Sequence, residues 1–162
     1  MKGLSREAFI EKGCLDIERF EKGIEQYPSL LISGADEVLY RFLEKCIELN
    51  DGQAYVDFYY PVLTKEEQLR FYNQLTPEEQ AYLMHFEHQG QYIYYPLTED
   101  NLGFLAGITA RELLFSTFYF AGYKAAVWGN YGLRYPMFCF DNETRDKYQE
   151  LAVQCGLTTG GI

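Results

Sequence analysis

The pattern that most constrains the fold is the aromatic region at residues 113–140. Apolar and aromatic side chains fill three short segments there, at 113–120, 125–129 and 133–140. The AGYK and NYG segments between them carry the glycine and asparagine that tight turns favour. Segments rich in aromatic and branched residues, separated by short turns, predict strands that pair in sequence order. We therefore expect an antiparallel meander in the last third of the chain.

The first two thirds of the chain have helical periodicity. Apolar residues recur every three or four positions, and two capping boxes, TKEE at 64–67 and TPEE at 76–79, mark helix starts. Ser33 is expected to cap the most regular helix, which ends at the Asn-Asp-Gly turn after Leu49. The predicted helices span about residues 6–12, 14–26, 34–49, 65–74, 77–87 and 98–105.

The order of these elements predicts the fold class. A closing helix is expected between Asp141, as its N-cap, and Gly156. Helices followed by a meander indicate an α+β fold, with N-terminal and central helices packed on a small antiparallel meander sheet and a closing C-terminal helix. Two brief strands are predicted at 54–60 and 92–96, a single domain at 1–157, and a flexible tail at 158–162.

The charge of the chain limits the partners that it can bind. Its formal net charge is −10 and its pI is near 4.6. The acidic residues concentrate between 36 and 100, whereas residues 101–140 are nearly uncharged. Phosphate backbones repel such a surface, so we do not expect nucleic-acid binding. An acidic surface instead favours fast association with a basic protein.

The hydropathy pattern and the cysteines predict a location. No apolar run reaches the roughly 18 residues that a membrane helix needs. The first residues, MKGLSREAFIEKG, lack the apolar core of a signal peptide. The four cysteines lie far apart in the sequence, which is typical of reduced thiols. We therefore expect a cytoplasmic protein that does not contact a membrane.

Motifs for catalysis or cofactor binding are weak. The HFEH segment places His85 and His88 at i and i+3 on one helix face, where both can bind a metal ion if a third ligand is supplied. Two exposed histidines at the favourable end of a helix dipole are the simpler interpretation. Nucleophile elbows and phosphate loops are missing, and Cys139 lies between two phenylalanines, where a thiol is inert. We expect no cofactor.

The segment VWGNYGLRYPMFCF at 127–140 has two interpretations. It contains the only tryptophan, Trp128. In the first interpretation, Asn130 forms part of a hairpin turn and the aromatic residues belong to a sheet core. In the alternative, the segment forms a shallow aromatic binding face with Arg134 at its centre, where the guanidinium can lie over Trp128 or Tyr131.

In its small size, low pI, aromatic strands and lack of a catalytic motif, the chain resembles bacterial immunity and antitoxin-type proteins. The resemblance is one of general type and assigns no residue. It implies a non-enzymatic domain that binds and neutralises a basic partner, and tyrosines beside acidic residues suit such an interface. The alternatives are a small-molecule or metal-dependent enzyme with a cleft near His85 and His88, and a domain that self-associates. The predicted binding residues are Tyr55, Asp57, Tyr59, Glu66, Glu67, Tyr92, Tyr94, Trp128 and Arg134.

Overall fold

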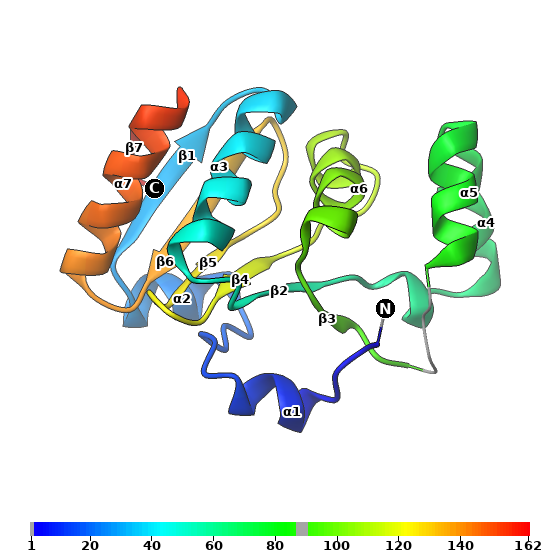
Figure 1. The fold of residues 1–162 in the computed structure, drawn as a ribbon, viewed down its shortest axis with the longest axis horizontal. Helices are drawn as coiled ribbons and strands as arrows, with labels where there is room; N and C mark the ends of the chain where they lie inside the picture. Colours follow the sequence, from blue (N-terminus) through cyan, green and yellow to red (C-terminus); the bar gives the residue numbers. More distant parts are fainter. Residues whose placement is uncertain (1, 87–90) are drawn as a thin grey trace.

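The computed structural model describes residues 2–86 and 91–162. A seven-stranded antiparallel sheet runs through this part of the chain, in the order β3-β2-β4-β5-β6-β1-β7 (Figure 1). Helices pack on the sheet, and the fold is α+β as the sequence predicts. The strands are β1 (Ser29–Ser33), β2 (Ala54–Asp57), β3 (Tyr94–Pro96), β4 (Phe118–Phe120), β5 (Ala125–Val127), β6 (Arg134–Cys139) and β7 (Thr158–Gly160).

Strands β4, β5 and β6 form the predicted meander. Phe118 pairs with Val127 across β4 and β5, and Ala126 pairs with Phe138 across β5 and β6. Apart from Arg134, the residues of these strands are buried on both faces of the sheet. A strand that is covered on both faces has no reason to alternate polar with apolar residues, which explains its continuous aromatic composition.

Strand β1 and the C-terminal residues differ from our expectation. We predicted that Ser33 caps a helix and that residues 158–162 form a flexible tail. In the structure β1 lies between β6 and β7, with Leu30 opposite Met137 and Ser33 opposite Thr158. The run SLLIS is too short to show a period of its own, and it becomes a strand because both of its edges find partners and Leu30 and Ile32 are buried.

The helices cover both faces of the sheet (Figure 1). Successive side chains of β4, β5 and β6 point to opposite faces of the sheet. Phe118, Val127 and Met137 therefore belong to a first core cluster on one face, and Tyr119 and Phe138 belong to a second core cluster on the other face. Helices α3, α6 and α7 pack on the first cluster, and α1 and α2 lie on the opposite face. The helices are α1 (Arg6–Glu11), α2 (Phe20–Gln26), α3 (Asp36–Leu49), α4 (Lys65–Asn73), α5 (Pro77–His85), α6 (Glu99–Ala110) and α7 (Asn142–Cys155), with a 3-10 turn, η1, at Tyr60–Val62.

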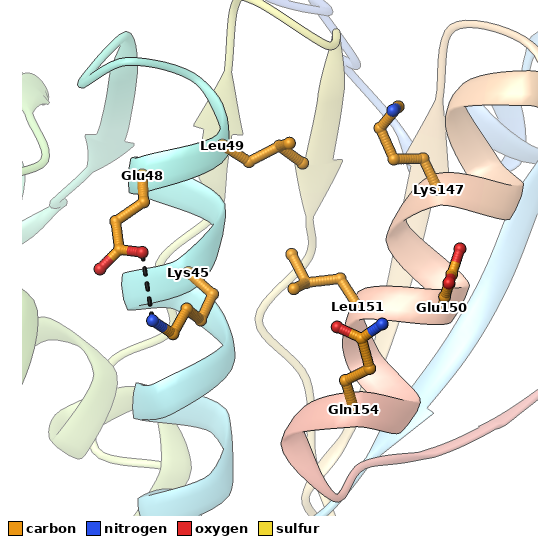
Figure 2. Close-up of a pocket in the computed structure, with 7 residues that line it drawn as sticks. All are labelled: Lys45, Glu48, Leu49, Lys147, Glu150, Leu151 and Gln154. Carbon is orange, nitrogen blue, oxygen red and sulfur yellow. Dashed lines mark hydrogen bonds and ion pairs between the residues drawn. The ribbon is translucent and has the colours of Figure 1, made fainter.

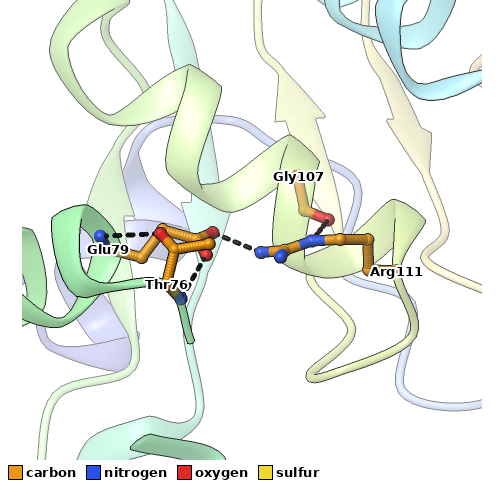
Figure 3. Close-up of polar contacts among 4 residues, drawn as sticks. All are labelled: Thr76, Glu79, Gly107 and Arg111. Atoms are coloured by element: carbon orange, nitrogen blue, oxygen red, sulfur yellow. Dashed lines mark hydrogen bonds and ion pairs between the residues drawn. The ribbon is translucent and has the colours of Figure 1, made fainter. Parts of the chain in front are cut away.

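Helices α4 and α5 stand at the β3 end of the sheet, beside α6 (Figure 1). Each begins with the predicted capping box, and the Thr76 backbone amide donates to Glu79 at 3.0 Å. Glu79 also accepts a hydrogen bond from Arg111 at the end of α6, and the Arg111 Nε donates to the Gly107 carbonyl (Figure 3). Partial burial raises the pKa of Glu79, but its bonds with Thr76 and Arg111 outweigh that effect and hold the pKa below its ordinary value.

Replacing Arg111 with glutamine is therefore expected to lower the free energy of unfolding by at most about 1 kcal/mol at pH 7, because both partners are partly exposed. The folded-state pKa of Glu79 is depressed, so this contribution is present above the ordinary pKa of the carboxyl and is lost as the pH falls through the folded-state value. Urea unfolding at pH 7 and pH 3 measures the difference. The control is Arg70→Gln, which removes an exposed pair with Glu66 inside α4; an equal effect of both variants at both pH values would contradict the prediction.

Candidate functional site

A cleft of about 560 Å³ opens at one end of the sheet, on the face that carries α1 and α2. Sheet register explains its position, because Asp57 pairs with Tyr94 across β2 and β3 and its amide binds the Thr117 carbonyl just before β4. Because side chains two positions apart in a strand share a face, Asp57 lies on the face of Tyr55, and Thr117 lies on that of Tyr119, which is the face of the second core cluster. The residues lining the cleft are Arg6, Asp16, Ile17, Glu18, Asp57, Tyr59, Tyr94, Phe115, Thr117, Tyr119, Trp128 and Gly129.

Asp57 is the buried charged group of this cleft. It is the last residue of β2, and only 2% of its surface is exposed. Its Oδ1 accepts a hydrogen bond from the Thr117 amide at 2.7 Å, and its Oδ2 accepts one from the Tyr119 hydroxyl at 3.1 Å. Burial raises the pKa of Asp57 to about 7, against the opposing effect of these hydrogen bonds. The carboxyl group therefore changes its charge near neutral pH.

Three phenols surround Asp57, from Tyr59, Tyr94 and Tyr119. Burial, and then the neighbouring Asp57 carboxylate, raise the pKa of Tyr59 to about 12. The same two causes raise the pKa of Tyr119 well above its ordinary value. All three hydroxyls consequently stay protonated at neutral pH, so they offer Asp57 and any ligand neutral hydrogen-bonding groups.

Helix α1 supplies the opposite wall and the cation of the cleft. The Ser5 hydroxyl caps this helix by accepting from the Ala8 amide. Phe9 stacks on Tyr94 with ring centroids 4.0 Å apart. Arg6 donates from Nη1 to the Tyr94 hydroxyl at 3.1 Å and from Nη2 to Asp16 at 2.8 Å, and Nη2 lies 3.7 Å from a Glu18 oxygen. Arg6 is thus paired with the carboxylates at the rim of the cleft.

Trp128 belongs both to the sheet core and to the cleft, the two roles that the sequence suggested for its segment. One side of the ring packs edge-on against Phe20 and Phe138 in the second core cluster, yet the residue also lines the cleft. The turn interpretation accounts for Asn130, whose Nδ2 donates to the Arg134 carbonyl at 3.2 Å. Arg134 is exposed at the start of β6 and does not line the cleft.

The other predicted binding residues lie at several places. Tyr55 is half-buried against the second core cluster, and Tyr92 lines a pocket of about 280 Å³ that adjoins the cleft through Arg6, Tyr59 and Tyr94. Glu66 and Glu67 lie in the first turn of α4, where Glu67 accepts from the Thr64 amide at 2.9 Å and Glu66 pairs with Arg70 at 3.4 Å. The cleft thus brings together Asp57, Tyr59, Tyr94 and Trp128 from the predicted set.

Of the two histidines predicted as an alternative metal site, His85 is described by the structure. His85 is exposed, with its Nδ1 2.8 Å from the Ala81 carbonyl oxygen, and it lines a pocket of about 350 Å³ with Asp100. His88 lies outside the described residues. Within 2–86 and 91–162, no group of three histidine, cysteine or acidic side chains has an arrangement that fits a metal ion.

Sequence reasoning missed the wall opposite Asp57. Arg6, Asp16 and Glu18 come from α1 and the connection that follows it, and they carry no motif. Asp57 was predicted because it is an acidic residue beside tyrosines; a stronger signal is its place inside the otherwise apolar run AYVDFYY, since a charge in a buried strand requires partners. Nothing in the sequence indicated that Phe115 and Thr117, before β4, would form the side of the same cleft.

A second hollow lies between α3 and α7, with a volume of about 480 Å³ (Figure 2). Leu49 and Leu151 point toward each other across it, and Lys45 pairs with Glu48 along α3 at 3.2 Å. Its charged side chains of both signs, Lys45, Glu48, Lys147 and Glu150, are all exposed. It contains no buried ionisable group, so the cleft at Asp57 is the better candidate site.

Comparison with known proteins found no matching family model, no similar curated protein and no similar solved structure. Among the helices that the structure describes, none has both the length and the apolar character required to cross a membrane.

Proposed function

We propose that the protein is a non-enzymatic binding domain that docks a basic partner protein over the cleft at Asp57. The observation that carries the proposal is the burial of the Asp57 carboxylate in a cleft whose rim holds two further carboxylates, Asp16 and Glu18. Arg6 balances part of this charge, and the remainder favours a cationic ligand.

The aromatic side chains of the cleft support a protein ligand. Tyr59 is 40% exposed and Trp128 is partly exposed, so both rings remain available at the opening. Tyrosine and tryptophan next to charged groups dominate the energetics of protein interfaces, because they bury a large apolar area and keep a polar end. The adjoining pocket at Tyr92 extends this surface beyond the cleft.

The overall charge supports rapid capture of such a partner. A net charge of −10 steers a basic protein toward the surface and accelerates association at low salt. A domain that covers the active site of a basic enzyme, as immunity-type inhibitors do, would have these properties. We place it in the cytoplasm, because Cys46, Cys139 and Cys155 are free, buried thiols.

The test compares two variants with the same change in net charge. Asp16→Asn with Glu18→Gln removes the rim carboxylates, whereas Glu66→Gln with Glu67→Gln removes exposed carboxylates in α4 and keeps a side chain that can complete the capping box. We expect the immobilised wild type and the α4 variant to retain the same basic protein from a native lysate at low salt, and the rim variant to retain at least tenfold less. Equal retention by all three proteins, or no basic protein retained, would overturn the proposal.

A further inference from the structure

We propose that the cleft receives a primary ammonium group, the end of a lysine side chain, and that Asp57 is its counter-ion. This inference rests on the proposed function, in which the lysine belongs to the basic partner.

In the described part of the chain, the buried Asp57 carboxylate has no counter-charge. Within 2–86 and 91–162, no lysine or arginine forms an ion pair with its carboxylate. The cation in the cleft, Arg6, is paired with Asp16 and Glu18 and donates to Tyr94 instead. Burying a carboxylate without a cation is costly, and the cost falls when a cationic ligand enters.

Hydrogen-bond acceptors remain open on the floor of the cleft. The Thr117 amide and the Tyr119 hydroxyl each donate to one Asp57 oxygen, and the Thr117 hydroxyl also hydrogen-bonds to this carboxylate. A carboxylate has about four acceptor sites, so acceptor capacity remains for a ligand. The Tyr119 oxygen donates its proton to Asp57 and keeps its own acceptor sites. An ammonium group has three donors and no acceptor, so it matches a floor made of acceptors. A guanidinium binds a carboxylate best through two parallel hydrogen bonds, one to each oxygen, whereas an ammonium group needs only one open acceptor site. Because Thr117 and Tyr119 already donate to the two Asp57 oxygens, the ammonium group fits this carboxylate better.

Aromatic side chains also line this cleft. Phe115, Tyr59 and Trp128 line the cleft, and their ring faces suit both the four-carbon stem of lysine and its charge. The volume of about 560 Å³ exceeds what one side chain fills, so the cleft can admit the stem together with part of the partner's backbone.

The pH dependence of lysine binding would distinguish Asp57 from the other ionisable groups of the cleft. These groups are Arg6, Asp16, Glu18, Asp57, Tyr59, Tyr94 and Tyr119. Burial keeps the three phenols protonated between pH 6 and pH 8, as described above. Burial also raises the pKa of Asp57 to about 7, so this carboxylate is mostly ionised at pH 8 and mostly protonated at pH 6. A cation bound by Asp57 should therefore bind about tenfold more weakly at pH 6 than at pH 8.

Trp128 makes the test direct, because it is the only tryptophan of the chain and lines the cleft. The probe is N-acetyl-lysine methylamide, and its fluorescence titration is compared with that of the norleucine analogue, which has the same stem without the ammonium group. Sodium chloride is adjusted to equal ionic strength. We expect a saturable response to the lysine probe at pH 8, binding at least tenfold weaker for norleucine, and a tenfold loss for lysine at pH 6.

The matched variant is Asp57→Asn, which keeps the shape of the side chain and removes its charge. It should lower the affinity for the lysine probe at least tenfold and abolish the pH dependence, while Asp146→Asn, which removes an exposed carboxylate on α7, changes neither. Equal binding of norleucine, or unchanged lysine binding by Asp57→Asn, would overturn the inference. Retention of a basic protein without any response to lysine would overturn this inference and leave the proposed function standing. A lysine response without a retained protein supports the inference and overturns the proposed function.

Discussion

Asp57→Asn is expected to raise the free energy of unfolding by about 2–4 kcal/mol at pH 8, because a pKa displaced by about three units corresponds to roughly 4 kcal/mol. Burial raises the pKa of the Asp57 carboxyl to about 7, from an ordinary value of 3.8. At pH 8 this carboxyl is ionised in both states, but its ionisation costs more free energy in the folded protein than in the unfolded chain. Asparagine retains the oxygen that accepts from the Thr117 amide and carries no charge.

The sign of the effect fixes the pH range in which it appears. Between pH 3.8 and about 7, the folded state binds more protons at Asp57 than the unfolded state does, so the wild type loses stability as the pH rises through this range. The asparagine variant does not share this loss. The difference between the two proteins should consequently be small below pH 4, grow up to pH 7 and stay constant above it.

Urea unfolding at pH 4, 5, 6, 7 and 8 measures this difference. Asp146→Asn is the control, because Asp146 is an exposed carboxylate on α7 and should show no comparable pH-dependent gain. A variant as stable as the wild type at pH 8, or less stable, would mean that the ionised Asp57 stabilises the fold. The expected result instead marks Asp57 as a group that lowers stability, as residues at binding sites commonly do.

The parts of the fold that the sequence predicts well are those set by local chemistry. The capping boxes at Thr64 and Thr76 fix the starts of α4 and α5, and Asp141 caps α7 by accepting from the Thr144 amide at 2.8 Å. The meander follows from turn residues between aromatic runs. In each case the determining residues lie within a few positions of the element that they define.

The parts that were missed depend on contacts between distant segments. Strand β1 forms because β6 and β7, from the far end of the chain, hydrogen-bond to its two edges. The cleft has the same origin, because Asp57 meets Thr117 across 60 residues and Arg6 meets Tyr94 across 88. Composition and spacing identified Asp57, Tyr59, Tyr94 and Trp128 as candidates, but they cannot show which residues the sheet register places opposite them.

Gly129→Ala is expected to have the second large effect, because it disrupts the wall of the cleft. A Cβ atom at this position would lie 2.5 Å from the Ser116 carbonyl oxygen and 3.0 Å from the Phe115 Cβ. Both sides of this contact are held in place, because the Ser116 amide donates to the Thr109 hydroxyl and the amide of Trp128, next to Gly129, donates to the Pro136 carbonyl. We expect a loss of about 1–3 kcal/mol in the free energy of unfolding, the usual cost of forcing extra atoms into a packed site.

The same substitution should also weaken the lysine probe at least tenfold, because the segment that must shift carries Phe115 and Thr117 of the cleft. Gly107→Ala is the matched control: this glycine lies inside α6 with open space at its Cβ position, and alanine there should stabilise the helix by about 1 kcal/mol. Urea unfolding and the Trp128 titration are performed on both variants. If Gly129→Ala unfolds like the wild type, the close approach of Gly129 to Ser116 does not hold the wall. If it is destabilised but binds lysine normally, the wall contributes to the fold and not to recognition, because binding then survives its displacement.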